Sequence, residues 1–70
     1  MINIGMKIGG FEIYGICNEY CIAKSTSPDI ADLYIVYKID SQNFVHADKY
    51  FTSKEDAEKE FARHVFVWFK

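Results

Sequence analysis

The sequence contains few residues that break regular secondary structure and no long apolar run. Its 70 residues include one proline, Pro28, and four glycines, all within the first fifteen positions. Its longest apolar runs, Leu33–Tyr37 and Val65–Phe69, are five residues each, whereas a membrane-spanning helix needs about 20. No flexible linker or repeat divides the chain, and its length allows one domain. We therefore expect a single domain over residues 1–70 that makes no membrane contact.

Cysteine and histidine are also scarce. Cys17 and Cys21 are too few for the disulfide framework of a small secreted domain. The histidines, His46 and His64, stand too far apart to complete a zinc finger with them. Residues 1–7 lack the basic and apolar regions of a secretory signal. We expect a soluble, cytoplasmic protein with reduced cysteines, no metal and no cofactor.

Neither sign of charge dominates the sequence. Eight Lys and Arg against ten Asp and Glu leave a net charge of −2, which is too acidic for a general nucleic-acid binder and too mild for a phosphate mimic. The glycines form no phosphate-binding pattern. The carboxylates show no spacing that predicts an acid–base pair in a cleft. These observations predict that the protein is not an enzyme.

What the sequence does have is aromatic residues, 12 in all. A chain this short buries only about 60% of its unfolded surface, so its core needs large side chains. Four stretches rich in β-branched and aromatic residues, bounded by turn residues, predict strands. They are Gly10–Ile16, Glu19–Lys24, Leu33–Asp40 and Phe44–Phe51.

The last two stretches predict a hairpin whose register depends on its loop. A two-residue loop would place Ile39 opposite Phe44, and a three-residue loop would place Asp40 there. We favour the three-residue loop, because it separates an apolar face from a more polar one and because Asn43 tolerates the left-handed conformation that ends such loops. The apolar face is expected to carry Leu33, Ile35, Tyr37, Ile39, Val45, Ala47 and Phe51.

After Phe51 the spacing of the apolar residues changes from that of a strand to that of a helix. Ser53 with Asp56, or Thr52 with Glu55, provides a capping box for a helix. The helical stripe that follows contains Ala57, Phe61, Val65 and Trp68, widened by Ala62, Phe66 and Phe69. We predict an α+β fold in which an antiparallel sheet of three to four strands carries one C-terminal helix on its apolar face (ββββα). The segment Val65–Phe69 can end as helix or as strand.

The opposite sheet face is the candidate binding surface. Its aromatic centre and polar rim resemble a protein–protein interface. The predicted partner-binding residues are Tyr34, Val36, Lys38, Asp40, Phe44, His46, Asp48 and Tyr50. The first hairpin or the N-terminal segment could instead cover this face and make it core.

Three alternatives to this reading of the surface remain open. The aromatic face could stack the bases of single-stranded nucleic acid, although Asp40 and Asp48 would repel phosphate. The acidic loop Asp29–Asp32 could contact a partner. A homodimer could bury the C-terminal apolar residues Val65, Phe66, Trp68 and Phe69.

The string Lys49–Ala62, a strand running into a capped helix, resembles the ending of small sheet-plus-helix proteins of phages and mobile elements. Several anti-CRISPR and other anti-defence inhibitors have this size. The resemblance implies a non-enzymatic inhibitor that occludes a functional surface on a larger host protein or nucleoprotein complex. It assigns no functional residues to this chain.

Overall fold

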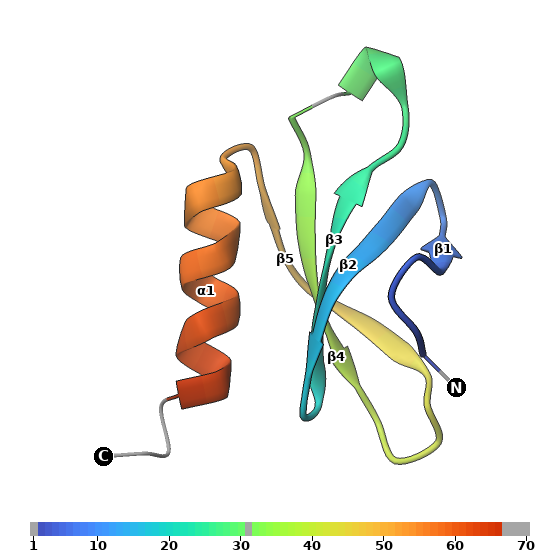
Figure 1. The fold of residues 1–70 in the computed structure, drawn as a ribbon, viewed down its shortest axis with the longest axis vertical. Coiled ribbons are helices and arrows are strands. Elements are labelled where there is room, and N and C mark those ends of the chain that lie inside the picture. Colours follow the sequence, from blue (N-terminus) through green and yellow to red (C-terminus); the bar gives the residue numbers. More distant parts are fainter. Residues whose placement is uncertain (1, 31, 67–70) are drawn as a thin grey trace.

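The computed structural model describes residues 2–30 and 32–66, which form an antiparallel sheet and one C-terminal helix (Figure 1). The strands pair in chain order, each with its sequence neighbours. They are β1 (Lys7–Ile8), β2 (Phe11–Cys17), β3 (Tyr20–Ser25), β4 (Tyr34–Ile39) and β5 (Val45–Phe51), with a short 3-10 helix η1 (Pro28–Ile30) before β4 and the helix α1 (Lys54–Phe66) after β5. The predicted α+β class is confirmed.

The expected count of three to four strands is wrong, because β1 adds a fifth. Its two residues pair with Phe11 and Glu12 of β2. A segment this short, set between glycines, carries no alternation that a sequence pattern can detect. Gly9 and Gly10 both adopt positive φ in the turn that returns the chain to β2, a conformation that glycine reaches without steric cost.

Two asparagines shape the tight turns. Cys17 pairs with Tyr20 across a two-residue turn in which Asn18 has a φ of 55°. In the β4–β5 loop the Asp40 N–H donates to the Phe44 carbonyl at 2.9 Å, and Asn43 has a φ of 66°. Asn tolerates this region better than most residues with a side chain. The predicted three-residue loop, with Asp40 opposite Phe44, is confirmed.

A bulge at Asp48 changes the face assignment along β5. The register passes from Tyr37 opposite Ala47 to Val36 opposite Lys49, which leaves Asp48 as the extra residue. A one-residue shift sends every later side chain to the opposite face. Phe51 therefore lies opposite Tyr34, and it does not share the face of Ile35 as we expected.

The helix packs on the face opposite the predicted one. Ile22 of β3, Val36 of β4 and Ala57 of α1 are buried together. Half-buried side chains complete this layer: Tyr14, Tyr20, Tyr34, Phe51 and Phe61. The expectation that Ile35, Tyr37 and Ile39 face the helix is wrong for a physical reason. Both sheet faces are apolar, so the pattern alone does not select one of them. The bulge places Phe51 on the face that α1 covers.

The other face is closed by the curl of the sheet. Its buried residues are Ile13, Cys21, Ala23, Ile35, Tyr37 and Ile39. Ile2, Ile8 and Phe11 pack against them, and Figure 1 shows the N-terminal segment on the side of the sheet away from α1. The ring of Phe11 in β2 lies 6.3 Å from that of Tyr50 in β5, although two strands separate them in the sheet. Both faces of the sheet are thus largely core.

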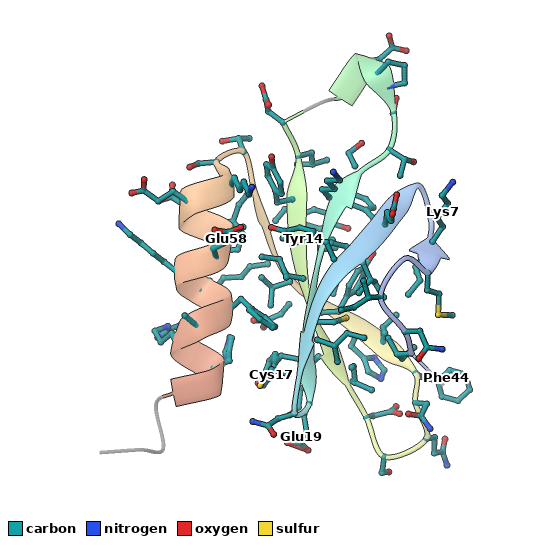
Figure 2. The ribbon with its side chains drawn as sticks, viewed as in Figure 1. Lys7, Tyr14, Cys17, Glu19, Phe44 and Glu58 are labelled. Atoms are coloured by element: carbon teal, nitrogen blue, oxygen red, sulfur yellow. The ribbon has the colours of Figure 1, made fainter. Side chains whose placement is uncertain are left out.

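The helix begins as its capping residues predict. The Asp56 N–H donates to Ser53 Oγ at 3.4 Å, which confirms Ser53 as the N-cap. Farther along, the Tyr14 hydroxyl of β2 donates to Glu58 of α1 at 3.4 Å (Figure 2). Burial, and then the Glu58 carboxylate, raise the pKa of Tyr14 to about 12.

The C-terminal prediction is tested only in part. Of the proposed dimer surface, Val65 and Phe66 belong to α1, whereas Trp68 and Phe69 lie outside the described residues. Within residues 2–30 and 32–66, no helix has the length and apolar character needed to cross a membrane.

Candidate functional site

The eight predicted partner-binding residues do not form one exposed face. Val36 is fully buried beneath α1, and Tyr34 is half-buried there with its ring inclined by 78° to that of Tyr14. Tyr50 is 61% exposed, but it pairs with Ile35 in the β4–β5 ladder and therefore lies on the sheet face away from α1. The expectation of one open face is wrong, because α1 covers its centre and the bulge divides its aromatic residues.

Four of the eight residues stay together at the turn end of the β4–β5 hairpin. We call this group the hairpin end, and it consists of Lys38, Asp40, Phe44 and His46. Lys38 and His46 are exposed and stand opposite each other in the ladder.

Asp40 organises the hairpin end. Its Oδ1 accepts the N–H of Gln42 at 2.9 Å and the N–H of Phe44 at 3.0 Å. Its Oδ2 lies 2.9 Å from His46 Nε2. The hydrogen bond with His46, followed by the Phe44 N–H, holds the pKa of Asp40 below its usual range. One carboxylate therefore holds both the loop backbone and the adjacent imidazole.

Phe44 is the apolar aromatic side chain of the hairpin end. It is 62% exposed, and Figure 2 shows it on the side of the molecule away from α1. Its backbone is nevertheless fixed, since its N–H and its carbonyl are both bonded to Asp40. The arrangement presents an apolar ring to solvent from a loop whose backbone is hydrogen-bonded to Asp40.

A second group of polar side chains lies where α1 meets β5. His64 Nε2 is 2.8 Å from Glu60 Oε2 and 3.1 Å from Asp48 Oδ2. The Glu60 side chain is only 10% exposed, that of His64 22% and that of Asp48 35%. We call Asp48, Glu60 and His64 the helix–strand triad. Of the predicted surface residues, only Asp48 belongs to it.

Basic side chains also contact the triad. Arg63 donates to both oxygens of Glu60, at 2.9 and 3.0 Å, and Lys49 Nζ lies 3.9 Å from Glu60 Oε2. The hydrogen bonds from Arg63 hold the pKa of Glu60 below its usual range. Glu60 is therefore an ionised carboxylate whose side chain is only 10% exposed.

The ring of His64 lies against Tyr20. The two rings stack with centroids 4.1 Å apart and planes inclined by 9°. A hollow of about 430 Å³ adjoins them, lined by Asn18, Glu19, Tyr20 and His64. In Figure 2 Glu19, at the turn between β2 and β3, lies at the same end of the molecule as the C-terminal end of α1.

The triad is the set of described residues that could hold a metal ion, since one donor atom from each lies within 4.8 Å of the others. The cysteines do not take part. Cys17 is half-buried and Cys21 is buried, and both are free thiols. Burial raises the pKa of the Cys21 thiol to about 11, which keeps it protonated and a poor ligand near neutral pH.

The sequence signal for the triad was only partial. Glu60 and His64 are four residues apart, a spacing that places two side chains on one helix face. Asp48 had no such signal, because its approach depends on the bulge and on which sheet face receives α1.

The fold and these two groups of residues define a small α+β protein, a curled five-stranded antiparallel meander with one helix. Comparison of the chain with known protein families, with curated proteins and with solved structures finds no match in any of the three.

Proposed function

We propose that this protein is a non-enzymatic binding module that occludes a functional surface on a larger host protein or nucleoprotein complex, in the manner of small phage inhibitors of the anti-CRISPR type. The observation that carries the proposal is the display of Phe44, an exposed ring on a loop that Asp40 holds in place. The hairpin end is the proposed contact surface.

An exposed phenylalanine on an ordered loop is suited to protein recognition. Burial of such a side chain in a partner's pocket is worth roughly 1.5 to 3 kcal/mol. Binding also has to offset the entropy lost when a loop is ordered. The two hydrogen bonds between Phe44 and Asp40 are already present in the free protein, so less ordering is needed on binding.

The surroundings of Phe44 fit the rim of an interface. Lys38, Asp40 and His46 supply both signs of charge and several hydrogen-bonding groups beside one apolar ring. Interfaces commonly surround a few energetically dominant residues with such polar groups, which contribute mainly to specificity.

The alternative of base stacking receives less support from the geometry. Sheet-based nucleic-acid binders stack successive bases on aromatic rings that share one open face. Here Tyr34 lies under α1, Tyr50 lies on the opposite face, and Phe44 lies at the turn end of the hairpin. A protein partner at the hairpin end needs only the last of these rings.

The test combines a functional assay with a capture assay. The tagged protein is expressed in bacteria with an active CRISPR or other nuclease defence, and the plating efficiency of a targeted phage is measured. We expect the wild type to restore plating and to capture a component of that defence, and we expect Phe44→Ala to lose both. Tyr50→Ala is the matched control, because it removes an equally exposed aromatic side chain that lies outside the hairpin end.

The outcomes separate the function from the surface. If no defence system is inhibited and no defence component is captured, inhibition is refuted. If Tyr50→Ala abolishes both readouts and Phe44→Ala neither, the function stands and the hairpin end is refuted as its surface. Far-ultraviolet circular dichroism of each variant verifies that the fold is retained.

A further inference from the structure

The helix–strand triad brings three metal-binding side chains together from two elements. Glu60 and His64 project from one face of α1, and Asp48 reaches them from β5. We propose that Asp48, Glu60 and His64 bind a divalent transition metal ion of the zinc class, which fastens the end of α1 to β5. The proposal is independent of the hairpin end and of any partner bound there.

The donor distances suit such an ion. Zinc binds imidazole nitrogen and carboxylate oxygen at about 2.0 to 2.2 Å, which holds tetrahedral donors roughly 3.3 Å apart. His64 Nε2 lies 2.8 Å from one carboxylate oxygen and 3.1 Å from the other. Small outward movements of the side chains would bring these two distances to the tetrahedral value.

The hydrogen bonding of His64 also points to a cation. A single ring nitrogen faces two carboxylate oxygens, and one N–H cannot be directed well at both. An ion between the three groups would satisfy the nitrogen lone pair and both carboxylates together. One imidazole with two carboxylates is a ligand set suited to Zn²⁺ and to neighbouring first-row ions.

The surrounding residues hold the ligands in position. Tyr20 stacks on the His64 ring and fixes its plane. Arg63 bonds both oxygens of Glu60 and orients that carboxylate, as outer partners of metal ligands commonly do. Asp48 is the bulged residue of β5, and bulges often redirect a side chain toward a site.

Two further features bear on the proposal. Lys49 Nζ lies 3.9 Å from Glu60 Oε2 and Arg63 Nη2 lies 2.9 Å from it, and both charges would oppose a metal ion. The Lys49 side chain is 54% exposed and can turn away into solvent, and Arg63 can keep its hydrogen bond to Glu60 Oε1. The Asp48 side chain is 35% exposed, so a water molecule can reach the ion from solvent as the fourth ligand, which three-residue zinc sites usually retain.

The test is metal binding by the full chain after treatment with a chelator. Zn²⁺ is titrated by isothermal calorimetry, and Co²⁺ is titrated by visible absorption, which reports coordination geometry and any thiolate ligand. We expect one ion per chain, no thiolate band and a higher thermal midpoint in zinc. His64→Gln and Asp48→Asn should each weaken binding by at least about 10-fold, the lower end of losses seen even for outer partners of metal ligands.

His46→Gln is the matched control. His46 also contacts an aspartate, Asp40, but among the described residues this pair belongs to no group of three possible metal ligands. It should bind zinc as the wild type does, and so should Cys17→Ser. The proposal is overturned if the wild type binds no ion, which would make the triad an ion-pair network only. It is also overturned if Asp48→Asn binds as tightly as the wild type, or if Cys17→Ser abolishes binding.

Discussion

Gly15 is the position at which one added methyl group tests the packing of α1 on the sheet. It lies in β2 opposite Ile22, directly after the bulge that interrupts the register between Ile13 and Gly15. A Cβ atom there would lie 2.8 Å from Ile22 Cγ2 and 3.8 Å from Phe61 Cε2. Its φ is not in the left-handed region, so alanine suits the backbone and only the space is lacking.

The magnitude follows from the shortest of these distances. A separation of 2.8 Å is about 0.6 Å below 3.4 Å, where ordinary van der Waals contact begins. Ile22 is only 2% exposed and packs with Val36 and Ala57, so it has little freedom to move away. Overpacking of this kind costs about 1 to 3 kcal/mol. For a domain of this size, each kcal/mol lowers the thermal midpoint by about 4 to 8 °C.

The sign of the effect makes Gly15→Ala a sharp test. If space were available, alanine would stabilise the protein by about 0.4 to 1 kcal/mol, because it restricts the unfolded chain. Urea unfolding followed by circular dichroism measures the free energy for the wild type, Gly15→Ala, Ile22→Ala and the double variant. Ile22→Ala deletes the colliding methyl, so Gly15→Ala should cost less in that background. Stabilisation by Gly15→Ala, or additive costs in the double variant, would refute the reasoning.

Three other predictions concern single side chains. Ser53→Ala should destabilise the protein by about 1 kcal/mol in urea unfolding, because the N-cap is lost. The neighbouring exposed residue provides the control, since Thr52→Ala should have little effect. Equal effects of the two substitutions would contradict the assigned cap. Because Cys21 is buried and its pKa is about 11, a thiol reagent should label Cys17 first in the folded protein and both in denaturant; equal labelling rates in the folded state would contradict this. The lowered pKa of Asp40 means that its contribution to stability is present above the unfolded-state value, near 3.9, and is lost as the pH falls through the folded-state value. Thermal midpoints of the wild type and Asp40→Asn should therefore converge in acid, and a gap that does not change with pH would count against the Asp40 network.

The local features of the fold were predictable because their signals are local. Alternation of side chains located β2, β3, β4 and β5 to within a few residues, since period 2 and turn residues both operate over short spans. The three-residue loop at Asn43 and the cap at Ser53 followed from the conformational preferences of single residues.

The assignment of faces was not predictable in the same way. The bulge falls at Asp48, within a polar stretch of β5 where no apolar residue marks the shift in register. Both faces of β4 are also apolar, so its pattern does not reveal which one receives α1. The predicted surface therefore combined residues that the bulge and the curl of the sheet separate. The same bulge brings Asp48 to His64, and sequence spacing alone has no signal for that contact.

The strictly sequential order of the strands has a consequence for how the chain folds. Each strand pairs only with strands adjacent to it in the sequence, and three of the four connecting turns are two or three residues long. Hairpins with such short loops close in about 1 to 10 μs, and topologies rich in local pairing fold faster than sheets built from distant segments. The helix, which contacts β3, β4 and β5, follows all of them in the chain. We therefore expect the sheet to form by local hairpin closure first and α1 to pack onto it in a later step of folding.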